Sequence, residues 1–139
     1  MRNKLSNPFY VELEKVFGLL HALQMFIERF QEILTVRPYS KEAIIDTYRD
    51  IHTYLTGAGL ILEVILDRIE KYGPKDNFLY DNINYFYNEI YKIKTAFWDA
   101  LLIYEKDPTR GINELYKISI ESLRVIGNII EFIARELNF

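Results

Sequence analysis

Four hydrophobic tracks run along the chain, and in each one the apolar positions recur at alternating spacings of three and four residues. The tracks run from Leu13 to Leu34, from Ile44 to Tyr72, from Leu79 to Tyr104 and from Ile112 to Leu137. This spacing lays an apolar stripe along an α-helix and is typical of the seam where supercoiled helices pack. The pattern predicts four amphipathic helices. The fourth track consists of Ile112, Tyr116, Ser119, Leu123, Ile126, Ile130, Ile133 and Leu137.

Turn-forming residues separate the tracks and set the expected ends of the helices. Pro38, Gly73 with Pro74, and Pro108 each interrupt a helical pattern. Ser40 is the expected N-cap of the second helix, and Asp76 or Asn77 could cap the third. The helices are therefore expected at about 8–35, 41–72, 76–106 and 109–138.

Connections this short favour consecutive helices that run in opposite directions. We therefore expect an all-α fold, an antiparallel up-down-up-down four-helix bundle with a heptad, coiled-coil-like core. The chain of 139 residues fits a single domain spanning residues 1–139. Its 50% apolar and 27% charged residues are typical of a globular protein, and the lack of cysteine excludes disulfides and thiolate chemistry.

The charge balance and the apolar runs narrow the classes of partner. A net charge of −3 makes nucleic acid an unlikely primary partner, because neutralising phosphates requires clustered Lys and Arg. Charged residues interrupt every apolar run, so we expect no membrane span and a cytoplasmic protein, in the host cytoplasm if the source is viral. Abundant Ile and scarce Gln, Met and Cys are compatible with a heat-adapted source, although Asn is plentiful.

The sequence contains no recognisable cofactor or metal motif. Neither His21 nor His52 has an acidic residue at the three- or four-residue spacing that a helical metal site uses, and no Walker loop or dinucleotide-binding turn occurs. We therefore expect no metal and no cofactor.

One constellation of polar residues falls toward the Pro38 end of the predicted bundle. Tyr48, Tyr104 and Tyr116 occupy track positions, Ser119 is the polar residue of its track, and His52 lies one turn beyond Tyr48. Two interpretations are open: a hydrogen-bonded core network, or a pocket for a small ligand.

Arg49 and His52 within this constellation give the pattern R-x-x-H-x-Y. The pattern resembles the motif of the HEPN ribonucleases, all-helical proteins in which Arg is followed by His. The resemblance implies RNA cleavage with His52 and Arg49 as catalytic residues. Only two residues intervene here, whereas the family motif has four to six.

The third and fourth helices carry apolar residues that the tracks do not use. Tyr and Trp are enriched at protein interfaces, and monomers seldom expose a large apolar patch. These rows therefore predict a partner-binding face across the third and fourth helices, unless half of each row packs internally. The face would consist of Tyr80, Tyr87, Tyr91, Trp98, Leu102, Ile118, Val125 and Phe132.

Together these patterns favour a non-catalytic protein–protein interaction module, either a homo-oligomer or a small regulator or subunit of a larger complex. Virion and CRISPR-associated bundles are analogies at the level of the fold only. The competing interpretation is an enzyme or small-ligand-binding bundle that uses the end around His52. Acidic residues such as Glu42, Asp46 and Asp50 gather near Pro38, but neighbouring Arg and Lys residues offset their charge, which argues against mimicry of nucleic-acid charge.

Overall fold

The computed structural model describes residues 8–73 and 77–139, and these residues form four helices and no strand. The helices are α1 (Tyr10–Thr35), α2 (Lys41–Tyr72), α3 (Asn77–Lys106) and α4 (Pro108–Leu137). The prediction of an all-α, four-helix fold is confirmed. None of these helices has the long, uninterrupted apolar stretch that a bilayer crossing requires.

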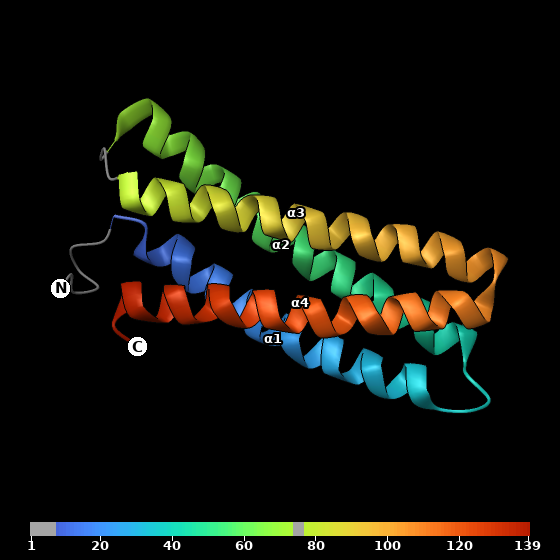
Figure 1. The fold of residues 1–139 in the computed structure, drawn as a ribbon. Coiled ribbons are helices and arrows are strands. Elements are labelled where there is room, and N and C mark those ends of the chain that lie inside the picture. The colour runs from blue at the N-terminus through green and yellow to red at the C-terminus, as the bar shows by residue number, and fades with distance from the viewer. Residues whose placement is uncertain (1–7, 74–76) are drawn as a thin grey trace.

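Each helix packs against two others, so the four surround one core (Figure 1). Helix α1 contacts α2 and α4, and α3 contacts the same two helices. The diagonal pair α1 and α3 meets through large side chains, since the rings of Phe30 and Phe97 lie 6.1 Å apart. The start of α1 and the end of α4 lie at one end of the bundle, together with the end of α2 and the start of α3.

The core is built from the predicted tracks of the first three helices. Every track position of α1 and α3 is buried, and in α2 the buried positions run from Ile44 to Ile69. Tyr72, the last position of the second track, is instead exposed. The expectation for Tyr72 is wrong because it is the final residue of α2, where the chain leaves the helix at Gly73 with φ 76°.

Helix α4 buries a wider stripe than its predicted track. Tyr116 is exposed and Leu123 is only partly buried, so their assignment to the core centre is wrong. Leu115, Val125 and Ile129 are buried in addition to the other track positions. Because α4 contacts both α1 and α3, its buried stripe extends to one side of the track and leaves the opposite edge exposed.

Polar side chains cap two of the helices. The Ser40 hydroxyl accepts a hydrogen bond of 3.1 Å from the Ala43 amide, which confirms Ser40 as the N-cap of α2. Asp107 accepts a hydrogen bond from the Arg110 amide at the start of α4, where Pro108 occupies the first turn. Helix α1 starts after Phe9 without a side-chain cap. The possible Asp76 cap of α3 lies outside the described residues.

Gly111 lets the start of α4 lie directly against the end of α3. A Cβ atom at Gly111 would lie 2.1 Å from the Tyr104 Cα and 2.4 Å from the Tyr104 nitrogen. Backbone atoms cannot rotate away as the end of a flexible side chain can. The two helices are joined by Asp107 alone, which leaves little slack for them to separate. Glycine is therefore required here for space.

We predict that Gly111→Ala destabilises the bundle by about 1–3 kcal/mol, because the added methyl group forces α3 and α4 apart. The matched variant is Gly18→Ala on the exposed side of α1, where no atom lies within 4 Å of the new Cβ. That variant should gain up to about 1 kcal/mol from its better helix propensity. Urea denaturation of both variants measures the difference. Equal stability of Gly111→Ala and the unaltered protein would contradict the tight contact.

Candidate functional site

The predicted aromatic row of α3 lies beside α2. Tyr91 is 63% exposed and Trp98 is 51% exposed, and the Trp98 ring lies 6.4 Å from the ring of Tyr48 on α2. Tyr80, at the other end of the row, donates a hydrogen bond from its hydroxyl to Glu70 of α2. The row therefore borders the junction of α2 with α3. The sequence had predicted instead a face shared by α3 and α4.

The α4 residues predicted for this surface are less exposed than those of α3, and their role in binding stays a prediction. Val125 is 8% exposed, and Ile118 and Phe132 are partly buried against the core. The Phe132 ring packs 5.8 Å from Phe78 and 5.0 Å from Phe86. Val125 belongs to the wide stripe that α4 buries against its two neighbours, and Ile118 and Phe132 lie at the edge of that stripe.

Helix α2 supplies the apolar neighbours that sequence analysis missed. Leu60 is 58% exposed, and Val64, one turn further on, is also exposed. Both lie off the predicted track, so their spacing of four residues was the available signal. We use the name aromatic face for the surface formed by Leu60, Val64, Tyr87, Tyr91, Trp98 and Leu102.

A hollow of about 120 Å³ lies within the aromatic face, at the junction of α2 and α3. Thr56 and Gly59 of α2 form one side, and Tyr87 and Tyr91 of α3 form the other. Glycine leaves this side open because it has no side chain to fill the space. The hollow also has charges of both signs at its edge, Glu63 on α2 and Lys94 on α3.

The structure divides the predicted tyrosine and histidine pocket among separate places. The His52 ring lies 5.9 Å from that of Tyr48, so these two side chains do lie together. Tyr104 instead packs its ring 6.0 Å from Tyr39 in the α1–α2 connection. Tyr116 borders a depression together with Leu34, near the end of α1, and Arg37 in the connection to α2.

The hydroxyl groups of this set, and that of the nearby Thr56, differ in whether they have a hydrogen-bond partner. Ser119 donates a hydrogen bond of 2.6 Å to the Tyr116 carbonyl oxygen of its own helix. The Tyr48 hydroxyl is buried and has no hydrogen-bond partner among the described residues, and the same holds for the Thr56 hydroxyl. Burial also raises the pKa of Tyr48 above its usual value. A fully hydrogen-bonded core network is therefore not what surrounds Tyr48.

The surroundings of His52 favour its neutral form. Partial burial lowers the pKa of the imidazole below its usual value of about 6.5, and the Lys94 ammonium on α3 lowers this pKa further. Arg49, its partner in the resemblance to HEPN ribonucleases, is mostly exposed and lies 3.7 Å from Asp46, one turn earlier on α2. The nuclease interpretation of Arg49 and His52 stays a prediction.

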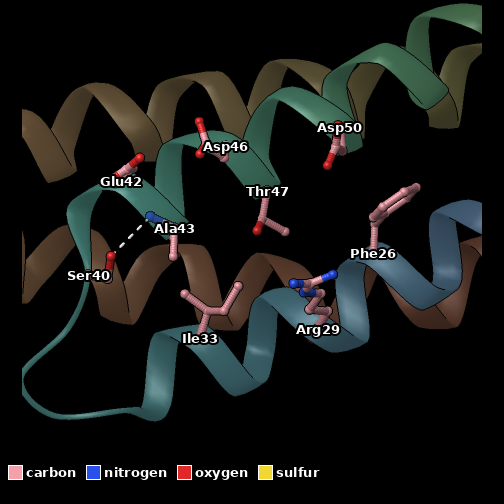
Figure 2. Close-up of a pocket in the computed structure, with 9 residues that line it drawn as sticks. All are labelled: Phe26, Arg29, Ile33, Ser40, Glu42, Ala43, Asp46, Thr47 and Asp50. Atoms are coloured by element: carbon pink, nitrogen blue, oxygen red, sulfur yellow. Dashed lines mark hydrogen bonds between the residues drawn. The ribbon is translucent and has the colours of Figure 1, made fainter.

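A further hollow, of about 340 Å³, lies between α1 and α2 near their connection (Figure 2). Phe26, Arg29 and Ile33 of α1 line one wall. Helix α2 and the residue before it supply the opposite wall, which consists of Ser40, Glu42, Ala43, Asp46, Thr47 and Asp50. The Ser40 hydroxyl is engaged as the N-cap described above.

Within residues 8–73 and 77–139, no three His, Asp or Glu side chains are grouped closely enough to hold a metal ion. Comparisons with known proteins give no identification: no family model matches the chain, and no curated protein and no solved structure shows significant similarity to it.

We predict that Tyr48→Phe raises the free energy of unfolding by about 1 kcal/mol, because the substitution removes a buried hydroxyl that lacks a partner. Chemical denaturation measures the change. Tyr104→Phe, another buried tyrosine of the set, serves as the comparison. A loss of stability in Tyr48→Phe would show that the hydroxyl does make a favourable hydrogen bond.

We also predict that His52 titrates below 6.5 in the folded protein, and that Lys94→Gln moves this pKa upward without fully restoring it, because burial is the larger cause. NMR titration of the imidazole protons measures both values. Since the unfolded chain then binds more protons than the folded one, His52 makes the protein less stable as the pH falls through about 6.5. A pKa above 6.5 in the folded protein would contradict the prediction.

Proposed function

We propose that the protein is a non-catalytic interaction module that binds another protein through its aromatic face. The observation that carries the proposal is the joint exposure of Leu60, Tyr91 and Trp98 on two adjacent helices. Large apolar side chains that remain exposed together, in a bundle whose core is already filled by other residues, are typical of interfaces.

The framework we propose for this face is an antiparallel, up-down-up-down bundle with heptad, coiled-coil-like packing. It is supported by the burial of the alternating track positions and by the helix ends that meet at each end of the bundle (Figure 1). In such a framework the backbones of α2 and α3 are held on both sides, so the aromatic face is rigid before a partner arrives. Rigid anchors lose little conformational entropy on binding.

The local contacts suit Trp98 and Tyr91 to be binding anchors. Trp98 lies over Tyr48, which limits the freedom of the indole while half of its surface stays open. Tyr91 and Leu60 stand beside the hollow formed at Gly59, which could receive an apolar side chain of the partner. A projecting aromatic group next to a recess is the arrangement in which interface residues contribute most to affinity.

A second copy of the chain is the partner that we propose first. Glu63 and Lys94 border the same hollow with opposite charges, so two copies of the face could place unlike charges opposite each other. Two-fold dimers built from one self-complementary patch are the commonest oligomers. If the chain proves monomeric, the aromatic face would instead dock on a subunit of a larger complex.

We predict that the chain self-associates, and that Leu60→Gln and Tyr91→Gln each weaken the association by roughly tenfold or more, because each removes an apolar anchor at an exposed position. Light scattering after size exclusion and sedimentation equilibrium measure the mass and the Kd. Met25→Gln on α1 is the matched control, because Met25 is as exposed as Tyr91 but lies outside the aromatic face.

The same three variants test the docking form of the proposal. If the protein is monomeric at sub-millimolar concentration, crosslinking in extracts of the native source should capture a partner with the unaltered chain and with Met25→Gln, but not with Tyr91→Gln. A monomer that yields the same crosslinks in all variants would leave the aromatic face without a binding role. Circular dichroism confirms that each variant is folded.

A further inference from the structure

The hollow between α1 and α2 has opposite charges on its two walls. The Arg29 guanidinium is on the α1 side, and the carboxylates of Glu42, Asp46 and Asp50 are on the α2 side (Figure 2). Not every basic residue near these carboxylates lines the hollow. Arg37, for example, donates a hydrogen bond of 2.8 Å to the Leu34 carbonyl oxygen.

These opposite charges do not pair with one another across the hollow. In the described part of the chain, Arg29 has no carboxylate within 4.0 Å, and neither Glu42 nor Asp50 has a cationic partner within that distance. Asp46 has an exposed contact with Arg49 at 3.7 Å, on its own helix. Figure 2 shows the Arg29 guanidinium and the Asp50 carboxylate turned toward the space from opposite walls, whereas the carboxylates of Glu42 and Asp46 point away from α1.

Thr47 adds a polar group at the back of the hollow. Its side chain is 7% exposed, and Figure 2 shows it pointing from α2 into the space toward α1. Threonine hydroxyls inside helices often bond to a carbonyl one turn earlier, as Thr53 does to Arg49 at 2.9 Å. The Thr47 hydroxyl makes no such bond and has no other hydrogen-bond partner among the described residues. The oxygen is not among the fully buried side-chain atoms without a partner, so it is accessible from the hollow and can hydrogen-bond to a ligand there.

Stabilisation of the helix does not account for the carboxylates. Acidic residues at a helix N-terminus interact favourably with its dipole, but only within the first turn. This explanation covers Glu42, which lies in the first turn of α2. Asp46 and Asp50 lie one and two turns further along, beyond the reach of this effect, and Asp46 contacts Arg49 instead.

We propose that this hollow binds a small zwitterion that carries a carboxylate and an ammonium group, such as a free amino acid. Arg29 would receive the carboxylate in its planar fork of donors, and Asp50 would receive the ammonium group. The Thr47 hydroxyl would hydrogen-bond to one of these groups, and Phe26 and Ile33 would cover the methylene chain. A volume of about 340 Å³ lies within the range of small-molecule sites. The proposal is independent of the aromatic face, which is built from different residues.

The test uses linear ω-amino acids from glycine to ε-aminocaproate as probes, together with pentylamine and caproate, which each carry one of the two charges. Amide NMR titration of the isotope-labelled full chain gives the Kd and the location of binding. At least one amino acid should shift the amides around Thr47 and should bind roughly tenfold or more tightly than either singly charged compound, because it alone engages both walls. Equal binding of pentylamine, or no shifts with any probe, would overturn the proposal.

Variants then assign the two walls. Arg29→Gln should weaken the preferred amino acid by roughly tenfold and leave pentylamine unchanged, whereas Asp50→Asn should weaken both compounds. Thr47→Val keeps the shape of the side chain and should weaken the binding of the amino acid. Asp67→Asn, a carboxylate of α2 outside the hollow that pairs with Lys71 at 3.3 Å, is the control and should change nothing. Loss of binding in Asp67→Asn equal to that in Asp50→Asn would reduce the effect to general charge attraction and overturn the site.

Discussion

The burial of four apolar stripes in one shared core is the constraint on which the rest of this structure depends. No helix of this kind is stable alone in water, because its stability comes mainly from packing of its apolar face. Each helix here contacts two neighbours, so each must present apolar side chains over an arc wide enough to meet both. Phe30 and Phe97 fill the centre of the core across its diagonal. The rotation of each helix about its own axis decides which side chains face the core and which remain on the surface.

That rotation separates the structural apolar residues from those available for binding. On α4 the arc takes in Val125 and Ile129, so these two apolar residues outside the predicted track belong to the core. On α3 the arc leaves Tyr91 and Trp98 outside, next to Leu60 of α2. The candidate interface therefore crosses the α2–α3 junction, and the α1–α2 junction carries a hollow of a different chemical character. A bundle of this size thus offers two distinct surfaces without disturbing its core.

Much of the fold could be predicted from the sequence because its signals are local. The track from Leu13 to Leu34 matches the buried residues of α1, and Ser40 caps α2 as its position and side chain indicated. The candidate sites were predicted less well. Tyr116, expected in the core, is exposed, and Val125, expected on the surface, is buried. A spacing of three and four residues gives the centre of an apolar stripe and not its width. The close contact at Gly111 depends on Tyr104 of another helix, which no local pattern reports.

The sequence by itself determined the four helices, their ends and the side of each helix that would seek the core, because helix propensity, capping and apolar spacing act between residues a few positions apart. The tertiary structure alone decided which flank of each stripe would be covered. It left the buried hydroxyls of Tyr48 and Thr56 without partners among the described residues, and it placed Arg29 opposite Asp50 across a hollow. These outcomes depend on the rotation and separation of neighbouring helices. Both are set by the packing of all four helices together, so no single segment of the sequence contains them.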